Sequence, residues 1–408
     1  MKILADTILI RDFTYELPHA KIAEYPLGAR DQSKLLVYDK GQITDERFYH
    51  LPQYLPADTN LVLNNTRVIE ARMLFQKPTG GVIEIFCLEP HQQSMEQAMQ
   101  QTQSTVWECL IGGASKWKPG QILEKTIDLD GASVRLTAQY VEKEEDHFLI
   151  QFRWELAHLP FVQIMHAAGA IPLPPYIKRK AEKMDWDRYQ TVFGRHEGSV
   201  AAPTAALHFT EDIFRALRQK NIAIDYVTLH VGAGTFKPVK TETIAGHQMH
   251  GEPFTVKKET LEHLLASQKI VAVGTTSLRT LESLYWLGVK LKNDPDAEAV
   301  LHQWEAYELS EKYGSPPCAD SFRALLDRME TQQVNEIHCK TSLIIVPGYA
   351  FKTAVGLITN FHQPQSTLLL LVAAFIGEDW KKVYQHALNH EYRFLSYGDS
   401  SLLWRKDQ

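Results

Sequence analysis

The chain has 408 residues, which is enough for two or three domains, and 44% hydrophobic and 23% charged residues are ordinary values for a globular protein with a large core. The formal net charge is −6, so the chain lacks the overall basic field of a general nucleic-acid binder. A local basic patch is still enough to bind RNA, and an RNA partner is therefore not excluded.

The four cysteines are scattered without any C-x-x-C pair, which argues against a zinc knuckle and against a disulfide scaffold: Cys87, Cys109, Cys318 and Cys339. The N-terminal stretch MKILADTILIRDF is interrupted at Asp6 and lacks the layout of a signal peptide. The longest apolar run, residues 368–376, is too short to span a bilayer. We therefore expect a reduced, soluble, cytoplasmic protein.

In chain order, the first change of character comes after residue 70. From Ala71 to Trp154, short β-type runs are broken by turn residues; for example, SVRLTAQYV and HFLIQFRW flank the acidic turn EKEED. This spacing predicts a small antiparallel β-barrel, inserted at residues 71–154.

The flanking segments, 1–70 and 155–408, predict one α/β core domain. In them, apolar β-type runs alternate with helical stretches; the runs are NLVLNNTRVI, IDYVTLHV, IVAVGTTS, SLIIVPG and VGLITNFH. Apolar strands interleaved with helices indicate a mixed sheet with helices on both faces. Residues 286–340 are polar and helix-prone, and we expect them to form an extra helical excursion of this core.

The segment IPLPPYIKRKAEKMDW combines a proline-rich run with basic and aromatic residues. Such a combination can follow a phosphate backbone and stack a base, so Tyr176, Lys178 and Arg179 are candidate RNA contacts. The alternative is a solvated surface loop.

The stretch GSVAAPTAALHFT, residues 198–210, places little side-chain volume beside His208 and Phe209. Small residues allow a close approach of the backbone, here to a neighbouring strand or to a ligand. Thr210 is expected to cap a helix that begins with two acidic residues. We expect a pocket with a floor of alanines and Phe209 as its wall, suited to a flat aromatic ligand.

Three later strands end in polar loops, and ligands of α/β sheets bind outside the carboxyl ends of strands. We therefore expect the turns after Val231, Val273 and Thr359 to meet at a single cleft. Backbone N–H groups at Gly274–Thr276 attract anions at a helix start, with the threonines as caps. On that helix Thr275, Arg279 and Glu282 share a polar face that suits a carboxylate and an amine or hydroxyl; an ordinary surface ion pair is the alternative.

Two other motifs are weaker. VGAGT lacks the third glycine and the acidic residue of a dinucleotide fingerprint, so we reject that interpretation. HQMHGE offers His247, His250 and Glu252 as conceivable metal ligands, but their spacing matches no helical zinc pattern. The alternative is a loop whose histidines form hydrogen bonds to backbone or substrate.

Taken in order, the motifs resemble one family closely, the S-adenosylmethionine:tRNA ribosyltransferase-isomerases of queuosine biosynthesis. The matching segments include LVLNNTRVIEARM, IPLPPYIKR, GSVAAPTAALHFT, VTLHVGAGTFKPV, HQMHGE, VAVGTTSLRTLES and LITNFHQPQSTLLLLVAAFIG, and they extend over nearly the whole core. The resemblance implies an α/β core with a small β-barrel, and no metal or other cofactor.

The implied reaction moves the ribosyl part of S-adenosylmethionine, a co-substrate, onto 7-aminomethyl-7-deazaguanine at the tRNA wobble position. The ribosyl part is isomerised, and adenine and methionine are released. The partners are tRNA with queuosine-type anticodons and S-adenosylmethionine, and we expect a monomer with no membrane partner.

We assign roles to the motif residues as hypotheses, because the reaction needs proton transfer, a holder for methionine and entry of an extruded base. The catalytic candidates are His208, His230, His362, Arg67 and Asp31, with Arg30 as an organising neighbour. Candidates for binding S-adenosylmethionine are Thr275, Thr276, Arg279, Glu282, Gly232, Gly234 and Asn360.

The chain departs from the family pattern at several positions. Asn65 stands where the family has aspartate, Ala206 where it has glycine, and Gln363 where it has leucine. The extra methyl group of Ala206 could narrow a pocket or forbid a positive φ. These departures leave two alternatives open, a paralogue acting on another RNA or a free base and a non-catalytic RNA-binding module. The residues His247, His250 and Glu252 keep a third open, a metal-dependent hydrolase.

Overall fold

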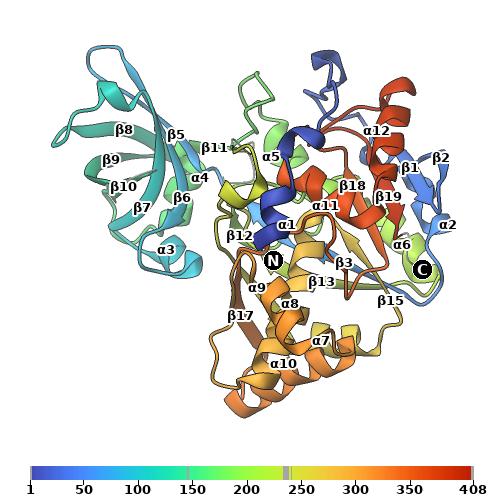
Figure 1. Cartoon of the computed structure of the whole chain (residues 1–408). Helices are drawn as coiled ribbons and strands as arrows, with labels where there is room; N and C mark the ends of the chain where they lie inside the picture. The colour runs from blue at the N-terminus through green and yellow to red at the C-terminus, as the bar shows by residue number, and fades with distance from the viewer. Residues whose placement is uncertain (1, 145–146, 233–238, 240, 406–408) are drawn as a thin grey trace.

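The computed structural model describes residues 2–144, 147–232, 239 and 241–405 and contains two main sheets (Figure 1). The larger sheet is mixed, and its middle strands β13, β3, β15 and β18 run parallel to one another. In spatial order its ten strands are β16 (Val300–Leu301), β17 (Glu336–Thr341), β14 (Glu252–Lys257), β13 (Ala223–Leu229), β3 (Thr59–Asn64), β15 (Lys269–Val273), β18 (Gly356–Asn360), β19 (Ser400–Trp404), β1 (Lys34–Asp39) and β2 (Gln42–Arg47).

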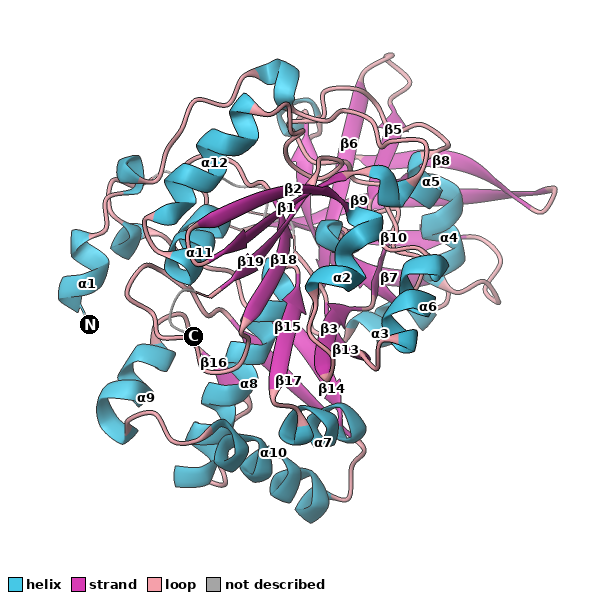
Figure 2. Cartoon of the chain, turned by 90° about the vertical axis from the view of Figure 1, so that its right-hand side faces the viewer, coloured by secondary structure: helices cyan, strands magenta, loops and turns pink. Residues whose placement is uncertain are grey.

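Helices cover both faces of this sheet, with α11 and α12 on one side and α2 and α6 on the other (Figure 2). Successive side chains of a strand point to opposite faces, and β3 is buried along its whole length. Val62 accordingly packs in the core beneath α8 and α11, whereas Leu61 and Leu63 pack with α2 and α6. The predicted mixed sheet with helices on both faces is confirmed.

The helices are α1 (Lys2–Thr7), α2 (Leu51–Tyr54), α3 (Met95–Gln100), α4 (Phe161–Ala168), α5 (Asp185–Arg188), α6 (Glu211–Gln219), α7 (Lys258–Ala266), α8 (Thr275–Asn293), α9 (Glu305–Tyr313), α10 (Cys318–Gln332), α11 (Thr367–Ile376) and α12 (Asp379–Asn389).

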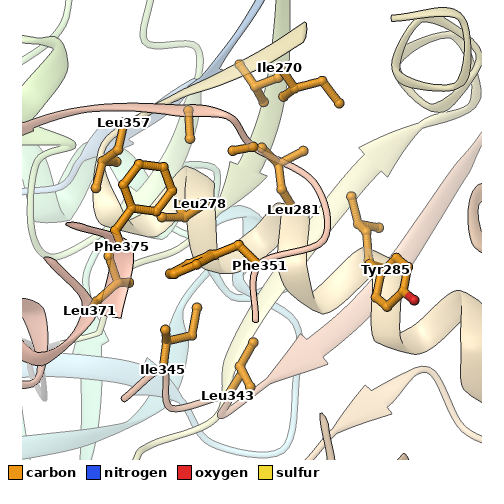
Figure 3. Packing of buried hydrophobic residues seen from close by; sticks show 14 of the residues in the cluster. Ile270, Leu278, Leu281, Tyr285, Leu343, Ile345, Phe351, Leu357, Leu371 and Phe375 are labelled. Carbon is orange, nitrogen blue, oxygen red and sulfur yellow. The ribbon is translucent and has the colours of Figure 1, made fainter. Parts of the chain in front are cut away.

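Helix α8 lies at the centre of the larger core. Its residues Leu278 and Leu281 face Ile270 and Leu357 of the sheet and Phe375 of α11 (Figure 3). Because most positions of the helix are buried, burial of apolar area fixes it against both the sheet and α10. This packing holds the first turn of α8 at the carboxyl edge of the parallel strands.

The smaller sheet is a separate lobe of antiparallel strands (Figure 1). It curls around a core that includes Phe75, Trp107 and Phe152, and helix α4 covers it with Phe161 and Ile164. Strand β8 approaches β5, but the described residues show no ladder joining them, so the sheet is a half-barrel. The predicted barrel is thus supported in part. In spatial order the strands are β11 (Gly169–Ala170), β5 (Arg72–Gln76), β6 (Val82–Pro90), β7 (Ser104–Gly112), β10 (Phe148–Trp154), β9 (Ala132–Lys143) and β8 (Ile122–Leu129).

The domain limits at residues 71 and 154 stay a prediction. The strands from β5 to β10 lie within them, whereas α4 and β11, which pack on this sheet, come after residue 154. The expected excursion at 286–340 starts inside α8, which continues to Asn293, and then forms β16, α9, α10 and part of β17. Among the helices that the structure describes, none is both long enough and apolar enough to cross a membrane.

Helices α8 and α10 approach so closely that a glycine is required between them. A Cβ atom at Gly288 would overlap the carbonyl oxygen of Ser321 on α10. The Ser321 hydroxyl also donates a hydrogen bond to the Tyr285 carbonyl, which ties the two helices together at this point.

We expect Gly288→Ala to lower the free energy of unfolding by about 1–3 kcal/mol, because the added methyl group overpacks this contact. Chemical denaturation measures the loss. Gly28→Ala is the matched control: a Cβ atom there meets nothing within 4 Å, so stability should change by less than about 0.5 kcal/mol. Equal stability of the two variants would contradict the close packing.

A charged cluster joins the half-barrel to the core. His166 of α4 lies 2.5 Å from the Glu70 carboxylate through Nδ1 and 3.4 Å from the Glu197 carboxylate through Nε2. Glu197 belongs to β12 (His196–Ser199), which pairs with β4 (Thr66–Val68) in a small two-stranded sheet. Hydrogen bonds to Glu197 and Glu70 raise the pKa of His166 from 6.5 to about 10.

The stabilisation by His166 should therefore depend on pH. Its pKa is higher in the folded chain, so its contribution is complete below about pH 6.5 and is lost as the pH rises toward 10. We expect the difference in unfolding free energy between wild type and His166→Gln to shrink across this interval in denaturant titrations. A difference that stays constant with pH would refute the charged cluster.

Candidate functional site

The residues from which the three predicted turns start meet at one edge of the larger sheet, and the turn after Val231 lies outside the described residues from residue 233 on. Val231, Val273, Thr359 and Asn360 border a common cavity of about 800 Å³, open solvent at its mouth included. The reason is topological: β13, β15 and β18 run in the same direction, so their carboxyl ends lie at the same edge. We call this space the nucleoside-side cavity. Ligand pockets of proteins commonly have volumes of this order.

The small residues of 198–210 supply one wall of this cavity. Ala201, Ala202 and Ala205 line it, and the Thr204 hydroxyl donates a hydrogen bond of 2.8 Å to the Asn360 side chain. The expected aromatic wall is wrong, however, because Phe209 does not line the cavity and is fully buried between Phe48 and Phe214, in the core that includes α2 and α6. Phe209 directly precedes Thr210, the cap of α6, and packs in the same core as the first turn of that helix.

A second cavity of about 840 Å³, again with open solvent included, adjoins the first. We call it the charged-side cavity, because Arg279 and Glu252 form a buried ion pair in its wall. Glu252 Oε1 also accepts a hydrogen bond from the Gly232 amide at 3.1 Å. Both cavities are bordered by Thr275, Thr276 and Leu368.

The start of α8 lies at this shared border. Gly274 precedes the helix with a φ of 91°, a left-handed conformation that glycine adopts without strain. The expected threonine caps are not formed, because the N-cap position is Gly274 and the threonines are the first two residues of the helix itself. Uncapped first-turn N–H groups and the helix dipole both favour an anion at this place.

Glu282 faces away from both cavities. Its carboxylate is fully buried and accepts hydrogen bonds from the Tyr349 hydroxyl at 2.7 Å, the Thr353 hydroxyl at 2.6 Å and the Lys352 and Thr353 amides. Burial raises the pKa of this carboxyl group. Glu282 is therefore bonded within the protein, and the carboxylate that lies beside Arg279 in the cavity wall belongs to Glu252.

The three candidate histidines do not come together. His362 lines the nucleoside-side cavity, with Nε2 2.9 Å from the Thr359 hydroxyl. His208 borders a separate small cavity of about 270 Å³, and His230 lies beside Gly198, outside the two adjoining cavities. Burial lowers the pKa of all three, to about 3 for His362 and about 4 for the others, so each ring is neutral near neutral pH.

The N-terminal candidates also lie outside the two cavities. Arg30 donates hydrogen bonds to the carbonyls of Gln190, Leu207 and Asp187 at 2.7–3.1 Å, which makes it a clamp between loops. Asp31 accepts a hydrogen bond from Thr210, the cap of α6. Arg67 is exposed on β4 and lies 3.8 Å from Glu197 of the charged cluster.

The proposed RNA contacts are divided between interior and surface. Tyr176 lines the nucleoside-side cavity, and its hydroxyl lies 2.6 Å from that of Ser396. Arg179 is engaged within the protein, because it donates two hydrogen bonds of 2.7 and 2.8 Å to the buried Asp185. Lys178 between them is exposed.

Among the candidate glycines, Gly232 borders the charged-side cavity, whereas Gly234 lies outside the described residues.

His247, His250 and Glu252 all border the charged-side cavity. Within the described part of the chain, however, they are not a group of three ligand atoms within 4.8 Å of one another, so this structure does not favour the hydrolase alternative.

The three residues at which the chain departs from the family pattern lie in different places in the structure. Asn65 accepts a hydrogen bond of 2.7 Å from Thr228, outside both cavities. Ala206 is buried in the core without a positive φ, so its methyl group neither narrows a cavity nor strains the backbone. Gln363 alone of the three lines the nucleoside-side cavity.

Sequence reasoning weighed Glu252 only as a metal ligand. Its pairing with Arg279 joins positions 27 residues apart on different elements, β14 and α8, and no local pattern reveals it. The signal in the sequence that could have indicated this role is that Glu252 is a lone acidic residue at the first position of a strand, directly after a polar loop.

Comparisons with known proteins agree with the motifs. A family model described as queuosine biosynthesis protein matches residues 10–403. An S-adenosylmethionine:tRNA ribosyltransferase-isomerase from Magnetococcus marinus is 36% identical over 406 residues, covering 98% of this chain and 95% of the relative. One of the same name from Nitrosomonas europaea is 37% identical over 400 residues, covering 96% and 95%.

A crystal structure of S-adenosylmethionine tRNA ribosyltransferase from Thermotoga maritima is 28% identical, with 96% of this chain and 99% of that chain covered and a TM-score of 0.46. The family model alone extends over nearly the whole length of the chain, and both curated relatives exceed one third identity. The chain therefore belongs to the queuosine biosynthesis protein family.

Proposed function

We propose that the protein transfers the ribosyl moiety of S-adenosylmethionine to 7-aminomethyl-7-deazaguanine at the tRNA wobble position and isomerises it, giving epoxyqueuosine with release of adenine and methionine. The shared name of the relatives supports this pair of substrates. The observation that carries the proposal is the pair of adjoining cavities, one charged and one lined by small and aromatic residues. S-adenosylmethionine has the same two-part character.

The charged-side cavity suits the methionine end. An α-amino acid carries a carboxylate and an ammonium group, and the Arg279–Glu252 pair offers the complementary charges. The first-turn N–H groups of α8 add a favourable environment for the carboxylate. In this assignment Glu252 takes the role that the sequence suggested for Glu282.

The nucleoside-side cavity suits adenosine. Its three alanines leave space for a flat ring, and Tyr176 and Phe361 supply aromatic surface. Thr204 and Asn360 form a polar pair that can exchange hydrogen bonds with ribose hydroxyls. Gln363 adds an amide to the same wall, so this side chain is where the family departure can affect substrate choice.

His362 is the histidine that we assign to proton transfer, since it alone of the three candidates borders the nucleoside-side cavity. Its neutral ring can accept a proton from the carbon beside the sulfonium group, and the imidazolium so formed, whose pKa burial lowers to about 3, can pass this proton to departing adenine. The target base must leave its stack to reach this cavity, and exposed Lys178 beside Tyr176 is the proposed phosphate contact. We further propose that the protein is a monomer and acts in the cytoplasm, where its tRNA substrate is found. The reaction itself is proposed to need no metal.

The reaction is tested by incubating the protein with S-adenosylmethionine and tRNA that carries the aminomethyl base. We expect adenine to be released only when this tRNA is present. Release with the free base would favour the paralogue, whereas tRNA binding without release would establish the non-catalytic alternative.

Arg279→Ala should raise the KM for S-adenosylmethionine at least about tenfold in the adenine-release assay at saturating tRNA, because a charge-assisted contact worth about 1.5–3 kcal/mol is lost. The variant also leaves Glu252 buried without its partner, so the stability should fall too. Arg279→Lys retains the charge and removes only the forked geometry, which provides a milder variant.

Lys290→Ala is the matched control. Lys290 lies on the same helix, about 16 Å from Arg279 along the axis, and forms a similarly shielded ion pair of 2.7 Å with Glu305. Its loss should reduce stability while the KM stays at the wild-type value. An unchanged KM in the Arg279→Ala variant would show that the methionine end does not bind in this cavity.

A further inference from the structure

A second polar cluster lies outside both cavities, where α12 packs beside the outer strands β1 and β2 of the larger sheet (Figure 1). It contains Asp45 of β2, His386 of α12 and His390, which follows that helix directly. One ligand atom from each residue lies within 4.8 Å of the others. The Asp45 oxygens are 2.9 and 3.0 Å from His386 Nε2.

Neighbouring groups orient each of these side chains. The Nδ1 atom of His390 lies 2.8 Å from the His386 carbonyl, so Nδ1 donates and Nε2 is left with its lone pair. The Tyr392 hydroxyl donates a 2.5 Å hydrogen bond to Asp45 Oδ1. Protein ligands of metal ions are oriented in this way by their remaining hydrogen bonds.

We propose that Asp45, His386 and His390 bind one divalent transition-metal ion of the zinc type. Two imidazoles and a carboxylate are a ligand set that suits zinc and exclude a preference for Mg²⁺ or Ca²⁺. The site is separate from the proposed reaction, for which the family resemblance implies no metal.

The geometry needs little adjustment to accept the ion. Tetrahedral zinc with bonds of about 2.0 Å places its ligand atoms about 3.3 Å apart. The Asp45–His386 separation is already close to this value, and the third ligand has to move inward by about 1–2 Å at most. Water completes the coordination, because Asp45 and His390 are exposed.

The two histidine rings support the same conclusion. Their centroids are 3.8 Å apart and their planes differ by 14°, so the two rings lie stacked against each other. His386 and His390 are four residues apart, so their rings project from the same side of the helix end. The ion would displace the Nε2 proton of His386, which in this structure faces the Asp45 carboxylate. Metal binding would link the end of α12 to β2, the edge strand of the larger sheet, whose outer side has no neighbouring strand among the described residues.

The test is calorimetric titration of the full-length, chelator-treated protein with Zn²⁺, together with thermal unfolding with and without the ion. We expect one saturable site and a higher Tm with Zn²⁺ and no effect of Mg²⁺. His390→Ala should weaken binding at least about tenfold and remove the zinc-dependent rise in Tm. His338→Ala is the matched control, because His338 is also exposed and lies 3.4 Å from the Glu336 carboxylate.

The readout is the zinc-dependent change, so a small loss of basal stability in a variant does not obscure the result. His386→Ala is the second variant and should behave like His390→Ala. Absence of one-to-one binding in the wild type, or equal binding by His390→Ala and His338→Ala, would overturn the proposal.

Discussion

The candidate site depends on the parallel direction of β13, β3, β15 and β18. Strands that run the same way deliver their following turns to the same edge, and here these turns come from parts of the chain more than one hundred residues apart. The packing of α8 between the sheet and α10 then fixes where the first helical N–H groups lie. Both cavities are consequences of these two constraints.

The sequence predicted this part of the molecule well because its information is local. Apolar runs mark buried strands, and glycine, threonine and serine mark the turns and the helix starts. The cap at Thr210 is formed as its position suggests. The mixed sheet and the meeting of Val231, Val273 and Thr359 at one cavity follow from such signals and from the general behaviour of α/β sheets.

The sequence predicted individual side chains less well, because polar partners are chosen by tertiary contact. Glu282 and Arg179 read as available charges, yet each is satisfied inside the protein by residues that no local pattern connects to it. Phe209 packs against Phe214 of the helix that follows it, and not beside the cavity lined by the small residues that precede it. The half-barrel likewise has the predicted strands, but closure depends on the curl of the sheet, which alternation of residues does not specify.

The border shared by the two cavities has a consequence for turnover. If S-adenosylmethionine occupies both, its two halves assist each other's binding, since the attachment of one half holds the other at high local concentration. Once the bonds to the ribose are broken, methionine and adenine each keep only the contacts of their own side. In that arrangement, two cavities joined along Thr275, Thr276 and Leu368 would favour the intact molecule and would let the two leaving fragments dissociate easily.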